Sequence, residues 1–344
     1  MLTQSALDSL LRLSAEIGGN RLLVQASGGN TSVKLGDTLW IKASGKWLAF
    51  AGNDEILVPV QLSTARDCLR QGAPLDCAIQ SFREEKHLRP SIETLMHAVL
   101  PHAVVVHVHS VNAIAWAVRA DAPVRLAERL SGLRWQWVPY VPSGLPLARA
   151  VEAFAACDVF VLGNHGLVVC GDSCAETSAL LDEVERRLAI EPRNAPESKL
   201  QNLEQVQRST GWWLPNSERL HSIATDPISR MVANSGILYP CQAVFLGRTL
   251  PEFPYSSLNS PPFWSVEGSG VLLNPNITKG EYAILEGFAE VLSRISPSAP
   301  LRYLTQAEID AAMGAESFQY RCAPDNRSPV QNWGFSACSG VHEN

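Results

Sequence analysis

The sequence contains no long apolar run, no excess of basic residues and no closely paired cysteines. Its longest apolar runs, at 103–108 and 159–162, are far shorter than the roughly 20 residues that cross a bilayer. Because 28 Lys and Arg residues stand against 34 Asp and Glu residues, the formal charge is -6, which gives no overall positive field to attract nucleic acid. We therefore expect neither a membrane nor a nucleic acid as a partner.

Cysteine usage and the N-terminal residues predict a cytoplasmic location. The 8 cysteines include no C-x-x-C pair. Asp8, Arg12 and Glu16 interrupt the apolar pattern of the first helix, whereas a secretory signal has an unbroken apolar block. Without export, the thiols are expected to be reduced and mostly buried.

Apolar spacing in the first half predicts alternating helices and strands. Leu7, Leu10 and Leu11 share one helical face, and Gly18 follows as a stop signal for this first helix. The pattern then predicts strands at 38–42, 56–60, 103–108, 159–162 and 167–170, and helices at 91–97, 111–119 and from 173 onward. This alternation is typical of the α/β class.

Two polar, glycine-containing loops lie in the first quarter of the chain, at 27–32 and 43–46. Their side chains could converge on one ligand. Further along, Ser91 is expected to cap a helix, with Glu93 in the first turn, where the helix dipole favours a carboxylate.

The apolar pattern lapses at 191–207, and this lapse predicts a domain boundary. Beyond it, helices are expected at 219–233, 281–295 and 304–312, and a short strand at 242–246. The resulting division is a first domain at 1–195, a linker at 196–215, a smaller α/β domain at 216–323 and an extended tail at 324–344.

Two histidines lie two residues apart at the end of a valine-rich strand, as His107-Val108-His109. Side chains at i and i+2 project from the same face of a strand, so both imidazoles are aimed at one point. Imidazole is a strong zinc ligand. The same short motif also arises by chance or at the end of a core strand, and a metal needs a third ligand.

His165 could supply that ligand, because it lies in the turn Gly163-Asn164-His165-Gly166 between two apolar runs. Alone, it is equally well explained as a histidine that stabilises the turn. Glu93 precedes the strand and could shuttle a proton near the same site; its alternative role is to complement the helix dipole. Three imidazoles leave one coordination position open for substrate, as a catalytic zinc site requires.

Five motifs together resemble the class II aldolase/adducin family over about residues 5–190. In order, they are Gly29-Asn30-Thr31-Ser32, Lys42-Ala43-Ser44-Gly45, Ser91-Ile92-Glu93, His107-Val108-His109-Ser110 and Asn164-His165-Gly166. Within the family, PSIETLMHAVLP, GGNTSVK and YLTQAEIDAAMGAESFQYR look most like the aldolase part of bacterial proteins that fuse a rhamnulose-phosphate aldolase to a short-chain dehydrogenase. The dehydrogenase itself is not expected here. Its G-x-G-x-x-G fingerprint is missing too, because Gly268-Ser269-Gly270 is followed by Leu273 where the pattern needs glycine.

The resemblance implies a three-layer domain, in which a central, mainly antiparallel sheet carries helices on both faces. It also implies a zinc ion, with manganese or cobalt as alternatives, held by His107, His109 and His165, and Glu93 as the acid/base. The substrate's anionic end is then expected at Gly29, Asn30, Thr31, Ser44, Gly45 and Ser91.

The implied reaction is that of a lyase, which makes or breaks a carbon–carbon bond in a small sugar-derived or hydroxy-acid substrate through a metal-stabilised enediolate. Decarboxylation and 4-epimerisation are alternatives at the same metal, and an adducin-like scaffold without chemistry is a third. A Schiff base on Lys42 or Lys46 is not required. The family also implies a homotetramer.

Two positions depart from the family pattern. Ile92 stands where a second hydroxyl residue often follows Ser91, so one phosphate contact is missing. A proton-donor tyrosine found in some members has no counterpart at 123–128. Tyr140 is a candidate substitute, although a buried structural role explains it as well.

Overall fold

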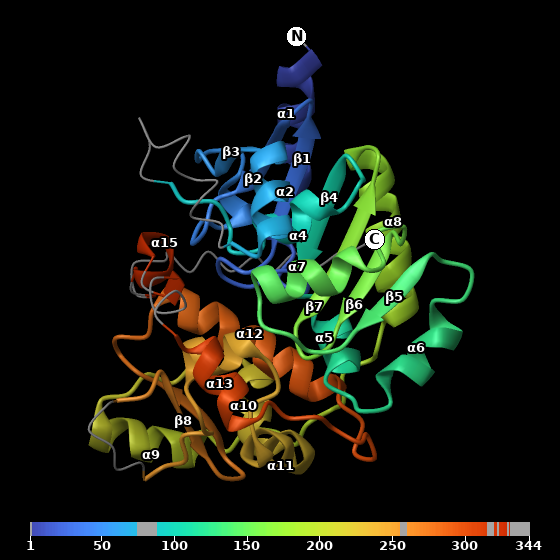
Figure 1. The fold of residues 1–344 in the computed structure, drawn as a ribbon. Helices are drawn as coiled ribbons and strands as arrows, with labels where there is room; N and C mark the ends of the chain where they lie inside the picture. Colours follow the sequence, from blue (N-terminus) through green and yellow to red (C-terminus); the bar gives the residue numbers. More distant parts are fainter. Residues whose placement is uncertain are drawn as a thin grey trace, which may run out of the picture.

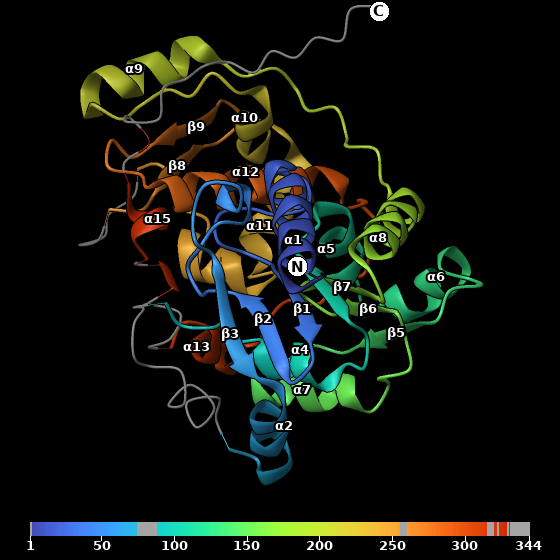
Figure 2. The same cartoon turned by 90° about the horizontal axis from the view of Figure 1, so that it is seen from above.

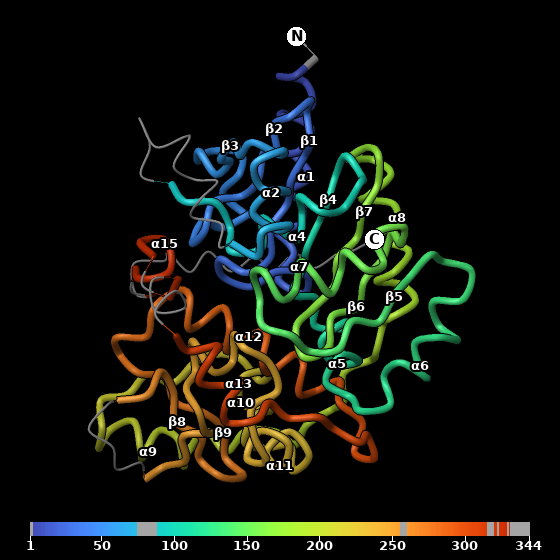
Figure 3. Tube along the Cα trace, in the orientation of Figure 1, coloured from blue at the N-terminus to red at the C-terminus, as the bar shows by residue number. Residues whose placement is uncertain are grey.

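The computed structural model describes residues 2–73, 88–254, 260–314, 320–321, 323–328 and 330. A seven-stranded sheet runs through the first half with the strand order β3-β2-β1-β4-β7-β6-β5. Figure 1 shows this sheet in blue to green, with the second half of the chain packed beneath it in yellow to red. The tube in Figure 3 follows the same path.

The sheet is antiparallel at every pairing except the parallel contact of β5 with β6. Its strands are β1 (Asn30–Leu35), β2 (Thr38–Lys42), β3 (Leu57–Gln61), β4 (Val104–Val108), β5 (Trp135–Val138), β6 (Val159–Leu162) and β7 (Gly166–Gly171). The predicted strands are therefore present, and the mainly antiparallel sheet is confirmed.

Helices cover both faces of the sheet, as expected for three layers. One face carries α1 (Leu2–Gly19), α5 (Val111–Ala117) and α8 (Cys174–Leu188), whereas the other carries α2 (Leu62–Gln71), α4 (Thr94–Val99) and α7 (Leu145–Glu152). Alternation along β4 explains the division, because Val104, Val106 and Val108 join the first apolar layer and Val105 joins the second. His107 shares the face of Val105. A further helix, α6 (Ala122–Arg129), packs its Leu126 into the first layer.

Two local predictions in this half are corrected. The loop expected at 27–32 ends at Gly29, because Asn30 already pairs with His107 in the sheet. The helix expected at Ser91 begins at Thr94, with Glu93 at its N-cap. The Ser91 hydroxyl accepts hydrogen bonds from the Glu93 amide (3.2 Å) and from Asn30 (3.1 Å), so it stabilises the preceding turn.

The second half is mainly helical and carries one antiparallel two-stranded sheet. Its elements are α9 (Leu200–Thr210), α10 (Glu218–Thr225), α11 (Pro227–Ser235), η3 (Gln242–Leu246), β8 (Phe263–Val266), β9 (Gly270–Leu273), α12 (Lys279–Arg294), α13 (Gln306–Ala312) and α15 (Pro324–Arg327). Viewed from above, α12 passes behind α1 and beside α5 (Figure 2). Val111 and Ile114 of α5 share one hydrophobic cluster with Phe288 of α12, so the two halves pack into each other.

Several predictions for this half need correction. The strand expected at 242–246 is a π-helical turn; every residue of the run is buried, so no alternation separates strand from helix. The helix expected at 219–233 breaks at Asp226, whose side chain caps α11. The expected linker holds α9, whose Leu203 packs against Trp212.

The tail expected from 324 begins with the short helix α15, and Asn326 within it is fully buried. Residues 331–344 lie outside the described part of the chain, and so do Cys77, Cys322 and Cys338. The other five cysteines are free thiols. In the described ranges, no helix combines the length and apolar character needed to span a membrane.

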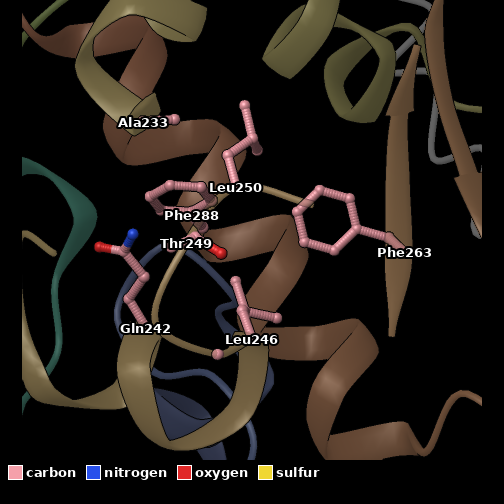
Figure 4. Close-up of a pocket in the computed structure, with 8 residues that line it drawn as sticks. Ala233, Gln242, Leu246, Thr249, Leu250, Phe263 and Phe288 are labelled. Carbon is pink, nitrogen blue, oxygen red and sulfur yellow. The ribbon is translucent and has the colours of Figure 1, made fainter. Parts of the chain in front are cut away.

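A pocket in the second half is lined by Phe263, Phe288, Leu250 and their neighbours (Figure 4). None of its lining residues carries an ionisable side chain; the complete set is Ala233, Gln242, Leu246, Gly247, Thr249, Leu250, Phe263 and Phe288. This pocket therefore offers no acid, base or metal ligand. Among the described residues, the group of side chains that could hold a metal ion lies in the first half, at His107, His109 and His165.

Candidate functional site

Three buried histidines meet at one end of the central sheet. His107 lies in β4, His109 directly follows the last residue of that strand, and His165 lies in the turn between β6 and β7. Because β7 pairs with β4 in antiparallel register, Leu167 opposite Val108, the turn returns His165 to the other two rings. One ring nitrogen from each histidine lies within 4.8 Å of the others, and the Nε2 atoms of His107 and His109 are 3.2 Å apart.

The Glu93 carboxylate completes this cluster. Its Oε2 lies 3.4 Å from Nε2 of His107, and its Oε1 lies 3.3 Å from Nε2 of His165. Asn30 donates a hydrogen bond to Oε2 (2.7 Å), and the Ser143 hydroxyl donates one to Oε1 (3.1 Å). Both carboxylate oxygens are therefore held while they face the imidazoles.

Burial and neighbouring charges set the protonation of the cluster. Burial lowers the pKa of His107 to about 4, against the opposing effect of Glu93, and burial with the adjacent rings holds the pKa of His109 well below its usual range. Burial alone would raise the pKa of Glu93, but His107, His165 and Asn30 outweigh it and keep this pKa well below its usual range. Near pH 7, His107 and His109 are therefore neutral and Glu93 is ionised.

The backbone around the histidines leaves no room for larger residues. A Cβ at Gly28 would lie 2.8 Å from Nδ1 of His109. Gly29 has a φ of +61°, and a Cβ there would lie 2.6 Å from the His107 carbonyl oxygen. These two glycines let the strand end approach the rings closely.

Each strand histidine has an outer partner. Nδ1 of His107 lies 3.0 Å from the Leu167 carbonyl oxygen, a contact that fixes which ring nitrogen faces Glu93. Nδ1 of His109 lies 3.6 Å from the thiol of Cys241, which belongs to the second half of the chain.

The donor set fits a divalent transition metal. Buried imidazoles whose low pKa values keep them neutral have free lone pairs, and neutral nitrogen ligands with a nearby carboxylate are what zinc prefers in catalytic sites. The residues that would hold the ion are His107, His109 and His165, and Glu93 faces the same point.

The turn that carries His165 is tied to the second half of the chain. Asn164 adopts a φ of +51°, and its Nδ2 donates to the carbonyl oxygens of Leu238 (2.8 Å) and Arg302 (2.8 Å). In return, Arg302 donates to Oδ1 of Asn164 (3.0 Å). The side chain of Asn164 thus positions its neighbour His165.

The residues expected to bind the substrate's anionic end lie on adjacent segments. Asn30 contacts Ser91 directly (3.1 Å). The loop of Ser44 and Gly45 runs beside them. The Ser44 amide donates to the carbonyl oxygen of Arg89 (2.8 Å), and the Ser91 amide donates to the carbonyl oxygen of Lys42 (3.2 Å). The side chain of Ser44 is exposed, whereas Gly45 is covered.

Two other candidates, Thr31 and Tyr140, make contacts outside the group of Asn30, Ser91 and the 43–46 loop. Thr31 lies on the opposite face of β1, and its hydroxyl contacts Ser14 (2.6 Å). Tyr140 packs with Ile237 and Leu304, under the guanidinium of Arg302, and burial raises its pKa to about 12. His97, four residues after Glu93, contacts the Ser32 hydroxyl (2.7 Å).

Sequence reasoning missed several residues at the site. Ser143 binds Glu93 and Cys241 contacts His109. Burial raises the pKa of Tyr320 well above its usual range, and the Glu93 carboxylate raises it further. Ser143 and Cys241 stand in none of the quoted motifs, and only the folded chain brings Ser143 to Glu93 and Cys241 to His109. Tyr320 lies in the segment YLTQAEIDAAMGAESFQYR, whose resemblance gave it no role.

Comparison with known proteins finds similarity over the first half of the chain. Residues 9–191, more than half of the chain, match the family described as Class II Aldolase and Adducin N-terminal domain. Over 202 residues, which are 52% of this chain, the sequence is 31% identical to the uncharacterized oxidoreductase YuxG of Bacillus subtilis (strain 168). The match spans only 29% of that relative's length.

Solved structures of related domains also resemble the chain. The N-terminal class II aldolase domain of a conserved protein from Thermoplasma acidophilum is 25% identical, with 53% of this chain and 91% of that chain covered and a TM-score of 0.46. An L-fuculose-1-phosphate aldolase from Thermus thermophilus is 16% identical, with 60% and 97% covered and a TM-score of 0.38.

Proposed function

Because this chain belongs to the class II aldolase and adducin family, we propose that it is a metal-dependent lyase acting on a small sugar-derived hydroxy-carbonyl compound or hydroxy acid. The reaction makes or breaks a carbon–carbon bond. The observation that carries the proposal is the meeting of His107, His109, His165 and the Glu93 carboxylate at one buried point. An adducin-like scaffold has no need for such a cluster.

In this proposal His107, His109 and His165 hold the cation, with zinc as the first choice and manganese or cobalt as alternatives. When bound, such an ion supplies a Lewis acid that stabilises negative charge on substrate oxygens. The buried outer contacts keep the rings oriented without it, as the bond of His107 to the Leu167 carbonyl illustrates.

Glu93 is the proposed acid/base. Asn30 and Ser143 hold its two oxygens, so the carboxylate can accept a proton from the substrate and return it without losing its place. Its low pKa keeps it ionised, in the form that accepts a proton.

Asn30, Ser44 and Ser91 are the proposed polar contacts to the substrate, and Gly29 allows the start of β1 to lie close to the His107 backbone. Thr31 is not among the proposed substrate contacts, because its hydroxyl is hydrogen-bonded to Ser14 on the opposite face of β1.

The acid that protonates the leaving fragment is proposed to be a tyrosine. Tyr140 and Tyr320 are both candidates. Tyr140 lies under the guanidinium of Arg302, which is bonded to Asn164 beside His165, and Tyr320 is a buried phenol whose pKa is raised by burial and also by Glu93. Tyr140→Phe and Tyr320→Phe should separate them: the donor's variant loses kcat while its metal content is unchanged.

The test of the proposed function is a screen of the metal-loaded protein against ketoses, ketose phosphates and hydroxy acids, with retro-aldol products and carbon dioxide both measured. Aldehyde release that a chelator abolishes supports the lyase. Carbon dioxide release would assign a decarboxylase, and stereochemical inversion without cleavage products an epimerase. A homotetramer, which family likeness favours, is checked by light scattering.

A further inference from the structure

A short segment near the end of the described chain lies on the predicted anion-binding loop. A Cβ added to Gly45, which has a φ of +77°, would lie 2.5 Å from the Cβ of Ala323. Gly45 is therefore covered by a residue that is almost 280 positions away in the sequence. We call residues 323–327 the C-terminal plug.

The plug is anchored by Asn326, which is fully buried. Its Nδ2 donates to the Ser27 hydroxyl (2.7 Å), and its Oδ1 accepts from Nε1 of Trp47 (2.7 Å). Ser27 lies in the loop before β1, and Trp47 directly follows the 43–46 loop. Hydrogen bonds with buried partners on both sides fix the plug in one position.

The plug also brings a negative charge to the lysines of the loop. Oδ2 of Asp325 lies 3.3 Å from Nζ of Lys46. Lys42 is buried, and its Nζ donates to the carbonyl oxygens of Ser27 (2.9 Å) and Lys46 (2.6 Å). Burial lowers its pKa to about 7, against the opposing effects of Glu93 and then Asp325. A second carboxylate, Asp54, lies 3.4 Å from Lys46 but belongs to the neighbouring turn rather than to the plug.

An anion that enters a site needs an uncompensated cation and space. Here the chain's own carboxylate already pairs with Lys46, and Ala323 fills the space over Gly45. A phosphate dianion at this place would meet the charge of Asp325 at short range, where like charges repel strongly.

We propose that the C-terminal plug occupies the anion subsite and that Asp325 is a specificity-determining residue that excludes phosphorylated substrates. The substrate is then a hydroxy-carbonyl compound whose end distant from the histidines carries no phosphate. This inference rests on the proposed function, because it narrows the substrate class of that same site.

The test uses inorganic phosphate as the probe and the full metal-loaded chain, at constant ionic strength set with chloride. Binding is measured by isothermal titration calorimetry for the wild type, Asp325→Asn and Asn326→Ala. We expect the wild type to bind phosphate only weakly, and each variant to bind it about tenfold more tightly. Asp325→Asn removes the competing charge with little change of shape, whereas Asn326→Ala releases the anchor.

Asp54→Asn is the matched control, because it removes a carboxylate from the same lysine and leaves the plug in place. Its phosphate affinity should equal that of the wild type. The inference is overturned by equal binding in wild type and Asp325→Asn, by no phosphate binding in any variant, or by an equal gain in Asp54→Asn. Metal content measured on the same samples reports on the proposed function separately, since phosphate binding at the loop requires no turnover.

Discussion

Arg302 and Asn164 are hydrogen-bonded to each other across 138 positions of sequence: Nη1 of Arg302 donates to Oδ1 of Asn164 (3.0 Å), and Nδ2 of Asn164 donates to the Arg302 carbonyl oxygen (2.8 Å). This reciprocal pair joins the second half of the chain to the turn that carries His165. The geometry of the histidine cluster therefore depends on residues well outside the family domain.

Replacing Asn164 tests this dependence. Asn164→Ala removes the hydrogen bonds to Arg302 and Leu238 and places a Cβ-bearing residue without a polar side chain at a φ of +51°. We expect the free energy of unfolding to fall by about 2–4 kcal/mol and the metal affinity to weaken, as measured by urea denaturation and metal titration. Asn164→Gly tolerates the backbone conformation and isolates the hydrogen bonds. Unchanged metal affinity in both variants would refute the positioning role.

Glu93→Gln tests the acid/base assignment. The amide has nearly the same shape and can still accept the hydrogen bond from Asn30, so the three histidines should retain the metal. Without a carboxylate to move the proton, kcat should fall by about 10²-fold or more. Steady-state kinetics and metal content measured together check this. A Glu93→Gln variant that turns over at the normal rate would show that Glu93 is not the acid/base. Ser143→Ala removes one hydrogen bond to Glu93 and should lower kcat less than Glu93→Gln does.

Lys42 predicts a pH dependence of stability. Burial lowers its pKa in the folded protein to about 7 from an ordinary value of 10.5, so the folded state binds fewer protons than the unfolded state between these two values. Stability then rises with pH in this window. We expect the stability of the wild type relative to Lys42→Met to rise by about 1–4 kcal/mol from pH 7 to pH 10.

Lys46→Met is the control for that measurement. Burial alone would lower the pKa of Lys46, but Asp325 and Asp54 raise it, so this lysine should not produce a rise in stability over the same window. Urea denaturation of the three proteins at several pH values makes the comparison. A wild-type curve parallel to that of Lys42→Met would mean that Lys42 is buried in its charged form without cost.

The histidine cluster could be foreseen because local rules determine it. The i, i+2 spacing puts His107 and His109 on one side of β4, and an apolar run, a tight turn and a second run return His165 to the same sheet end. The helix predicted to start at Ser91 starts later, because the hydroxyl that resembles a helix cap is bonded to Asn30 and to the Glu93 amide instead.

The second half could be predicted less well, because its contribution to the site is long-range. Cys241 and Asn326 stand in no motif, and each meets its partner from more than a hundred residues away. The apolar residues of the run 242–246 predict a strand, but burial on all sides leaves strand and helix indistinguishable from sequence. Long-range packing determines both the second-half contacts to the site and the helical conformation of 242–246.

Metal analysis of the purified chain after metal-replete preparation tests the central claim most directly. Elemental analysis should find about one Zn, Mn or Co ion per wild-type chain, and almost none in His107→Ala, whose circular dichroism should match that of the wild type. A metal-replete wild type without stoichiometric ion, or a His107→Ala variant that keeps the full amount, would contradict the account.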